Sequence, residues 1–168
     1  QKAAKGSKKA AKGSKKGPTD NQPGLILFYS QRGKYGCFSN FYTHDPVDIS
    51  CKVQVKSIDI DISLTFEFSE KAIMASKAII FNDNDTLKLI MSTSSPAECK
   101  RLGRLVRGFD EDTWKEVIND LAFQIVLAKF ESSNFMKYTL ISTGSSVLAE
   151  ASKSDSIWGI GMDAYNPD

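Results

Sequence analysis

The hydrophobic period of the sequence changes at Ser69, and this change limits the folds open to the chain more than any other feature. Residues 51–68 alternate apolar and polar side chains, the pattern of β-strands with one buried face. The apolar residues move from odd to even positions near Ser57, which indicates a bulge or turn between two strands because a one-residue shift exchanges the faces. After Ser69 the apolar spacing becomes helical. The chain is therefore predicted to place a small β-element before a series of helices.

Capping residues set the expected boundaries of these helices. Ser69 is a suitable N-cap for the first helix and puts Glu70 in its first turn, where the helix dipole favours an anion. The run Ser95-Pro96-Ala97-Glu98 is a capping box with Pro at N1, and it predicts a helix to about Val106. Asp110 can cap the next and longest helix. The remaining expected elements are a short helix at 135–141 that ends at Thr143-Gly144, a strand at 25–29, and an extended segment at 147–150.

The first 18 residues form a lysine-rich, low-complexity segment. The heptad Lys-Ala-Ala-Lys-Gly-Ser-Lys occurs at 2–8 and again at 9–15, and the 18 residues hold seven lysines and no acid. Such a segment is too polar to pack, so residues 1–22 are expected to be a disordered tail and 23–168 a single domain. Beyond the seven tail lysines the chain carries 15 basic and 20 acidic residues. Lysines 2–16 could make non-specific contact with nucleic acid or direct nuclear import, or they could simply aid solubility.

Cysteine and histidine usage limits the compartment and the chemistry. Cys37, Cys51 and Cys99 are odd in number and scattered, which favours reduced thiols in the cytoplasm or nucleus. His44 is the only histidine and lies in a turn-like run, so neither a metal site nor a histidine-based triad is predicted. No secretory signal is visible, and no apolar run approaches the ~20 residues of a membrane helix.

Two ionisable groups bracket the apolar stripe of the helix predicted at 69–78. Glu70 and Lys77 lie two turns apart, on the face that also carries Ile73 and Met74. Next to apolar groups a carboxyl has a raised pKa and a lysine a lowered one, and a neutral lysine is a nucleophile toward an aldehyde or anomeric carbon. The carboxyl can act as acid, base or stabiliser of an oxocarbenium ion. The alternatives are a structural ion pair, or a lysine that reaches out to solvent.

Three other stretches could bind a ligand. Arg101, Arg104 and Arg107 recur every three residues and, with Lys100, form a cationic edge that suits phosphate or is simply a solvated helix face. The loop 36–42 combines glycine, small polar residues and aromatics, as in a loop that clasps a sugar or in an ordinary turn. Near the C-terminus, Trp158 and Asp155 could stack on and hydrogen-bond a ring, although 158–161 lacks the spacing of a dinucleotide fingerprint.

Taken in order along residues 25–163, these motifs resemble those of the NADAR superfamily, whose name refers to NAD and ADP-ribose chemistry. The matching blocks are Gly36…Ser39-Asn40-Phe41, Ser69-Glu70…Lys77-Ala78…Phe81…Asp83, Leu102-Gly103-Arg104, Phe109-Asp110…Trp114, Ala128-Lys129-Phe130, Thr143-Gly144 and Glu150-Ala151-Ser152…Asp155…Ile157-Trp158-Gly159-Ile160-Gly161. The resemblance implies an α+β fold: a compact, helix-rich single domain with a small antiparallel β-element.

The resemblance also implies an N-glycosidase without a cofactor, which cuts the bond between a nucleobase-like nitrogen and the anomeric carbon of ribose. Expected substrates are ADP-ribosylated guanine in nucleic acid, or phosphoribosylamino-pyrimidine intermediates of riboflavin synthesis. The expected catalytic residues are Glu70, Lys77 and Asp155. The expected substrate-binding residues are Arg32, Gly36, Ser39, Asn40, Phe41, Arg101, Arg104, Trp114, Trp158 and Gly159, although Trp114 also begins an apolar stripe and suits the core.

The sequence departs from the family pattern at two places. Ala72 stands two residues after the acid, where the family usually has an aromatic ring. The chain also stops at Asp168, so we expect part of the C-terminal pocket wall to be missing. These departures leave open a third function, a module that binds ADP-ribose without cleaving it.

Overall fold

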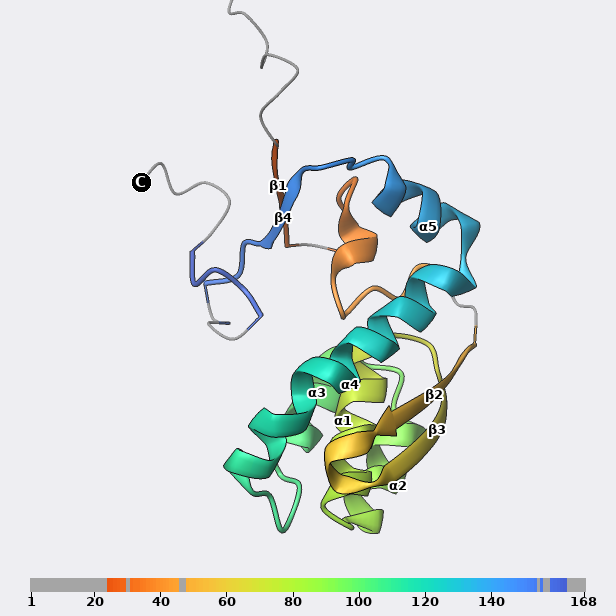
Figure 1. The fold of residues 1–168 in the computed structure, drawn as a ribbon, viewed down its shortest axis with the longest axis vertical. Helices are drawn as coiled ribbons and strands as arrows, with labels where there is room; N and C mark the ends of the chain where they lie inside the picture. Colours follow the sequence, from red (N-terminus) through yellow and green to blue (C-terminus); the bar gives the residue numbers. More distant parts are fainter. Residues whose placement is uncertain (1–23, 30, 46–47, 154, 156–157, 163–168) are drawn as a thin grey trace, which may run out of the picture.

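The computed structural model describes residues 24–29, 31–45, 48–153, 155 and 158–162 (Figure 1). The predicted tail at 1–22 lies outside these residues. In chain order the elements are β1 (Leu25–Phe28), the 3-10 turn η1 (Gly36–Phe38), β2 (Ile49–Val55), the 3-10 turn η2 (Lys56–Ile58), β3 (Ile60–Phe66), α1 (Ser69–Ile80), α2 (Asn84–Ser92), α3 (Pro96–Gly103), α4 (Glu111–Ser132), α5 (Asn134–Ile141) and β4 (Val147–Glu150). No helix in the described part of the chain has both the length and the apolar character needed to cross a membrane.

The alternating stretch folds as an antiparallel pair of strands. β2 runs against β3, with Ile49 opposite Phe66 and Val55 opposite Ile60. The connection is η2 followed by Asp59, whose φ of 52° is in the left-handed region. The inward side chains on both strands belong to the hydrophobic core. The predicted turn between two strands is thus confirmed, because η2 separates the two sets of alternating apolar residues.

Helix α1 is buried between the other elements. On one side Ala72 and Ile73 pack into the core formed with the β2–β3 hairpin and α4. On the other side Ala75 and Ala78 pack against α2 and α3. Each large side chain buried in this way contributes roughly 1.5–3 kcal/mol through the hydrophobic effect. The packing therefore fixes the rotation of α1, and with it the direction in which its remaining face points.

The start of α1 differs from the prediction that Ser69 is its N-cap. The N-cap is Phe68, with extended backbone and no side-chain cap, and Ser69 is the first helical residue. The Ser69 hydroxyl is buried and lacks a hydrogen-bond partner among the described residues. Instead, the backbone N–H of Glu70 donates to the carbonyl of Asn40 at 3.0 Å. The loop before β2 thus supplies, from its backbone, the acceptor that a capping side chain would have supplied.

The other predicted caps are present, with two changes. Ser95 Oγ accepts a hydrogen bond from the Glu98 N–H at 3.3 Å, and an Asp110 oxygen accepts from the Thr113 N–H at 2.8 Å. The capping box is incomplete because the Glu98 carboxylate binds Arg101 instead. Helix α3 also ends at Gly103, short of the expected Val106. Helix α2, capped by Asp83, was not predicted at all.

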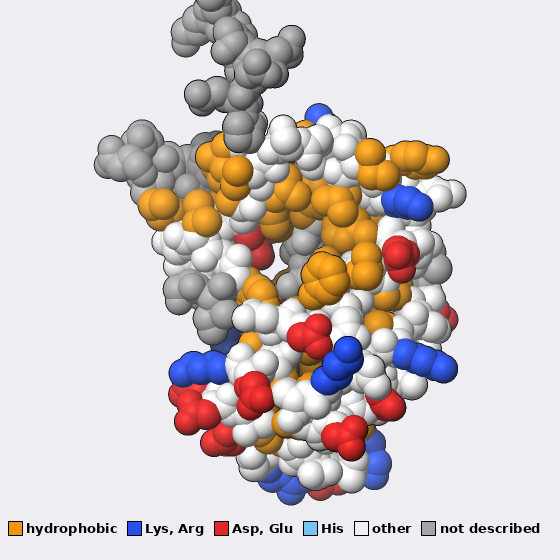
Figure 2. All heavy atoms as spheres, in the orientation of Figure 1, with side chains coloured by type: hydrophobic (Ala, Val, Ile, Leu, Met, Phe, Trp, Pro, Cys, Tyr) orange, Lys and Arg blue, Asp and Glu red, His pale blue; other side chains and the backbone are white. Residues whose placement is uncertain are grey.

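The two extended segments predicted at 25–29 and 147–150 pair with each other as a parallel sheet. Leu25 lies opposite Val147, and Phe28 lies opposite Glu150. Figure 1 shows this pair set apart from the hairpin, with α4 running between the two regions toward α5. The fold is the expected α+β domain, with a parallel pair of strands added to the expected antiparallel one. Figure 2 shows hydrophobic side chains gathered over the upper part of this face, where Figure 1 places β1, β4 and α5.

Candidate active site

Helices α1, α3 and α4 and the segment after β4 enclose a cavity of about 250 Å³. Glu70 and Lys77 both line it, together with Ile73 and Met74 from the same face of α1. The predicted acid–apolar–base face of this helix is therefore one wall of a cavity. The other lining residues are Lys100, Gly103, Arg104, Trp114, Ile118, Asp155 and Trp158.

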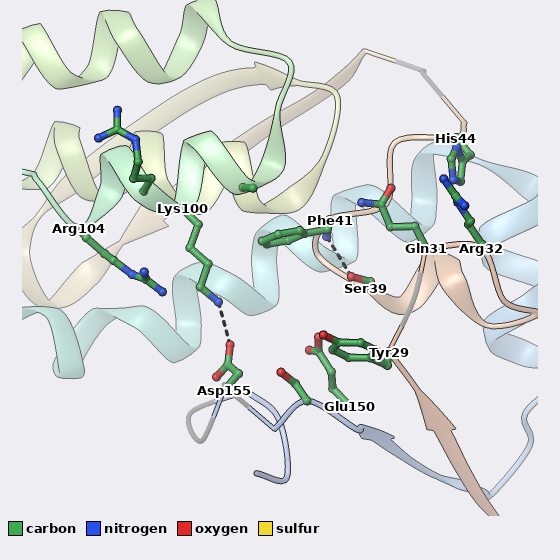
Figure 3. Close-up of a pocket in the computed structure, with 13 residues that line it drawn as sticks. Tyr29, Gln31, Arg32, Ser39, Phe41, His44, Lys100, Arg104, Glu150 and Asp155 are labelled. Carbon is green, nitrogen blue, oxygen red and sulfur yellow. Dashed lines mark hydrogen bonds and ion pairs between the residues drawn. The ribbon is translucent and has the colours of Figure 1, made fainter. Parts of the chain in front are cut away.

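A second, larger cavity of about 650 Å³ adjoins the first. The two cavities share three lining residues, Lys100, Arg104 and Asp155. In Figure 3, Lys100 and Arg104 extend toward Asp155 from one side, while Tyr29 and Glu150 lie together on the other. The remaining lining residues are Gln31, Arg32, Ser39, Phe41, His44, Ala97, Arg101 and Ser152.

Glu70 is a buried carboxyl group, with only 6% of its surface exposed. Burial raises its pKa to about 7, because the charged form loses hydration. The positive charges of Lys100 and Arg104 act against this shift, and the negative charges of Asp155 and Glu150 add to it. Near neutral pH the group is therefore divided between its acid and carboxylate forms, which suits proton transfer.

Lys77 lies against aromatic rings at the opposite end of the small cavity. Its Nζ is 3.8 Å from the centre of the Phe109 ring and 5.6 Å from that of Trp114. Burial lowers the pKa of Lys77 and so increases the share of the nucleophilic, neutral amine. Among the described side chains Lys77 forms no ion pair with Glu70. The structural ion pair that the sequence left open is absent here.

Lys100 joins the two cavities; the sequence placed it in the cationic edge but not among the expected substrate-binding residues. Its Nζ donates a hydrogen bond to Asp155 Oδ2 at 3.0 Å and lies 5.7 Å from the centre of the Phe41 ring. The other carboxylate oxygen of Asp155 accepts from the Trp158 N–H at 2.9 Å. The spacing of Lys100 is consistent with that edge, because Lys100 lies four residues before Arg104, the C-cap of α3.

The three arginines of the predicted cationic edge have different surroundings. Arg104 lines both cavities. Arg101 lines the larger one, but its guanidinium makes two hydrogen bonds to Glu98, at 2.6 and 2.8 Å. Arg107 binds Asp83 and Asp85 instead, so it ties the end of α3 to the start of α2. Only Arg104 and Lys100 therefore point a cation toward the junction of the cavities.

The predicted loop at 36–42 contributes in two ways. Ser39 and Phe41 line the larger cavity, as does Arg32 before them. Gly36 is buried inside η1 and lines neither cavity. Asn40 also lies outside both linings, but its carbonyl holds the Glu70 N–H.

Of the expected residues Trp114, Trp158 and Gly159, the two tryptophans line the small cavity, whereas Gly159 allows close packing of the segment after β4. Trp158 lines the small cavity, as does Trp114 from α4, which also packs on the core. Gly159 supports the segment, because a Cβ there would lie 2.7 Å from the Asp155 carbonyl oxygen. Glu150 lines the larger cavity but was absent from the expected site; burial raises its pKa.

Two further residues clarify what the site contains. His44, which was not expected to act, lines the larger cavity and packs edge-on against Tyr42. Ala72, where the family usually has an aromatic ring, is fully buried in the core and lines neither cavity. Across the described residues no group of His, Cys, Asp and Glu is arranged to hold a metal ion.

Comparison with known proteins identifies the family of the chain. The family model described as the NADAR domain matches residues 27–168. The chain belongs to the NADAR family. Among solved structures, the NMR structure of the E. coli protein YbiA superposes with a TM-score of 0.63 at 28% identity, covering 83% of this chain and 74% of YbiA. The similarity supports the α+β NADAR fold described above.

Several curated relatives of this NADAR chain carry functional names. N-glycosidase R617 of Acanthamoeba polyphaga mimivirus is 38% identical over 57% of this chain and 56% of its own length. N-glycosidase Npun_R5314 of Nostoc punctiforme is 31% identical, covering 82% of this chain and 80% of its own length. The chloroplastic riboflavin biosynthesis protein PYRR of Zea mays is 30% identical over 83% of this chain and 22% of its own length. The chain thus spans little more than half of the mimivirus relative.

Proposed function

We propose that the protein is an N-glycosidase that removes ADP-ribose from modified guanine. The observation that carries this proposal is the placement of Glu70 and Lys77 in one small cavity, each against apolar surroundings that shift its pKa toward neutrality. A lysine whose pKa is lowered and a carboxyl that is partly protonated near pH 7 suit the roles of nucleophile and proton donor in cleavage of an N-glycosyl bond. Two relatives named N-glycosidase add support for the reaction class.

In the proposed reaction Lys77 attacks the anomeric carbon of the ribose. A bond from that carbon to the lysine nitrogen forms as the bond to the base nitrogen breaks. Glu70 in its acid form donates a proton to the departing base, and its carboxylate then stabilises positive charge on the ribose. Opening of the ribose ring gives a Schiff base with Lys77, and water releases ADP-ribose and the free amine.

The charges around the cavities support an ADP-ribose substrate. The ribose that reacts would occupy the small cavity between Glu70 and Lys77. The pyrophosphate would lie at the junction, where Lys100 and Arg104 supply cations. The adenosine would then enter the larger cavity, beside Phe41 and Tyr29. A cavity of about 650 Å³ is within the usual range for a ligand of this size.

Base release from ADP-ribosylated guanosine tests the reaction directly. Chromatography should detect guanine-containing product with the wild type, and much less with Glu70→Gln or Lys77→Ala. Borohydride added during turnover should trap a covalent adduct at Lys77, detected by mass spectrometry of peptides. Absence of an adduct, together with a near-normal rate for Lys77→Ala, would mean that Lys77 is not the nucleophile.

A second candidate is an N-glycosidase acting on phosphoribosylamino-pyrimidine intermediates of riboflavin synthesis. The observation in its favour is the similarity to the maize riboflavin biosynthesis protein. Such a substrate has one phosphate, so it would need the small cavity and the Lys100–Arg104 pair but not the larger cavity. Comparing kcat/KM for the two substrate types decides between them, since only an ADP-ribose substrate should depend on residues such as Phe41.

A binding module without catalysis is the third candidate. It would share the cavities and the cations but would release no base from either substrate. Calorimetric binding of ADP-ribose, combined with no detectable base release, would favour this candidate over both enzymes.

A further inference from the structure

Lys129 on α4 is a buried lysine that the proposed mechanism does not use. Its residue surface is 2% exposed. Burying an ammonium group is costly unless its donors are satisfied. A buried lysine therefore needs a hydrogen-bond partner that offsets the lost hydration of its ammonium group.

The partner of Lys129 is a backbone carbonyl in the loop that borders the cavities. Its Nζ donates a hydrogen bond to the Ser39 oxygen at 2.7 Å. The rings of Phe130 and Tyr42 lie 5.4 and 5.9 Å from the same nitrogen. Burial lowers its pKa to about 8, and the nearby ionisable groups of Cys37 and Glu150 act in the opposite direction. Near neutral pH the hydrogen bond to Ser39 is thus mostly made by a charged donor, the stronger kind.

The loop 39–41 that Lys129 holds contacts the candidate active site in two ways. Ser39 and Phe41 line the larger cavity. Between them, the Asn40 carbonyl accepts the N–H of Glu70, the first-turn residue of α1. A hydrogen-bonded path therefore runs from Lys129 on α4, through the loop 39–41, to the backbone of the proposed acid.

We propose that Lys129 is a positioning residue, whose ammonium holds the loop 39–41 so that Asn40 fixes Glu70 at the start of α1 while Ser39 and Phe41 shape the larger cavity. This inference rests on the proposed function. It differs from a role in stability alone, because it predicts effects on binding and on the backbone of Glu70 in folded protein. Small displacements of reacting groups can cost large factors in rate.

Replacement of Lys129 by methionine tests the inference, because methionine has a similar length and no donor. Lys71→Met is the matched control: Lys71 is 3% exposed, binds Glu67 and the Met91 carbonyl, and lines neither cavity. Both variants should melt at lower temperature. At a temperature where each is folded, only Lys129→Met should lower kcat, roughly 10- to 100-fold. It should also weaken calorimetric binding of ADP-ribose and speed hydrogen exchange at the Glu70 amide.

Partial unfolding would lower kcat in proportion to the folded fraction and leave the Kd of the folded molecules unchanged. Wild-type kcat, Kd and Glu70 exchange in Lys129→Met would overturn the inference. If Lys129→Met does not fold, Lys129→Gln is the second variant. It keeps a hydrogen-bond donor, so kcat, Kd and Glu70 exchange should change in the same directions but by less. Wild-type values of all three in Lys129→Gln would also overturn the inference. If the wild type releases no base, the proposed reaction fails, while Kd and Glu70 exchange still decide the role of Lys129.

Discussion

At the scale of single residues, burial decides which charged side chains can act. Glu70 and Lys77 are shifted toward neutrality because they lie among apolar groups. Arg107 is instead held in a pair with the carboxylates of Asp83 and Asp85, and hydrogen bonds from Arg107 keep the pKa of Asp83 below its ordinary range. Lys77 and Arg107 are both cations, but burial prepares one for chemistry while paired carboxylates hold the other in a structural role.

The raised pKa of Glu70 predicts a pH-dependent stability. In the folded protein Glu70 holds its proton up to about pH 7, whereas the unfolded chain releases it near the ordinary value of 4.5. The folded state therefore binds more protons between these values, and its stability falls as pH rises through this window. Glu70→Gln removes this loss, so above pH 7 it should raise the free energy of unfolding by roughly 1–3 kcal/mol.

Denaturant unfolding at pH 5 and pH 8 measures this effect. The gain should be small at pH 5 and large at pH 8. Glu98→Gln is the control, since Glu98 is partly exposed on α3 and bound to Arg101, so it should show no gain at pH 8. An equal effect of Glu70→Gln at both pH values would contradict the assigned shift.

The two arginines on α3 should differ in their effect on binding. The Arg101 guanidinium is already hydrogen-bonded to Glu98, whereas Arg104 lines both cavities. Loss of a charge-assisted hydrogen bond costs about 1.5–3 kcal/mol, so Arg104→Met should weaken ADP-ribose binding roughly tenfold or more. Arg101→Met should change Kd only slightly. Calorimetry on both variants tests the distinction, and equal losses would place the pyrophosphate elsewhere.

At the scale of elements, the close approach of α3 to α1 sets the size of the small cavity. A Cβ at Gly103 would clash with the side chain of Met74, which lines the cavity beside Ile73. Gly103→Ala should therefore push Met74 toward the substrate, lower kcat/KM, and cost roughly 1–3 kcal/mol of stability through overpacking. The double variant Gly103→Ala/Met74→Ala should recover part of the lost kcat/KM. If it recovers none, Gly103 affects activity by another route.

Local signals predicted the elements that depend on local chemistry. The hairpin followed from alternation, and the caps at Ser95 and Asp110 followed from side chains that reach nearby N–H groups. The start of α1 could not be predicted in this way, because its acceptor is the backbone carbonyl of Asn40 and any residue type supplies one. The pairing of β1 with β4 also escaped prediction, since two strands of four residues carry no mark of their partner.

In the candidate site, too, local spacing predicted some residues, whereas others depend on contacts between distant segments. The shared face of Glu70 and Lys77 followed from helical spacing, and both residues line one cavity. Lys100 was placed in the cationic edge but not among the substrate-binding residues, because sequence spacing does not show which cations of such an edge reach a cavity. Its neighbour Arg101 has the same charge, but Arg101 binds Glu98 while Lys100 reaches Asp155.

At the scale of the whole molecule, charge is divided between the lysine-rich segment and the rest of the chain. Residues 1–18 carry seven lysines and no acid, and the rest has more acids than bases. If the substrate is nucleic acid, the lysines should supply most of the phosphate contacts. Deleting residues 1–17 should then weaken binding to ADP-ribosylated oligonucleotides and flatten its salt dependence, measured by fluorescence anisotropy. Activity on ADP-ribosylated guanosine should not change, and unchanged oligonucleotide binding would assign the lysines no part in recognition.

The parallel pairing of β1 with β4 has a consequence for the order in which the protein is made. β1 is among the first described segments to leave the ribosome, but its partner strand emerges only after α5. Asp155 and Trp158 follow later still, although they form walls of the cavity built on α1. The helices and the hairpin can thus pack together before these residues emerge, but the cavity can close only after Trp158 has left the ribosome. Pairing over so long a separation is also slow to form, so a chain still being translated would hold Glu70 and Lys77 in an unfinished site.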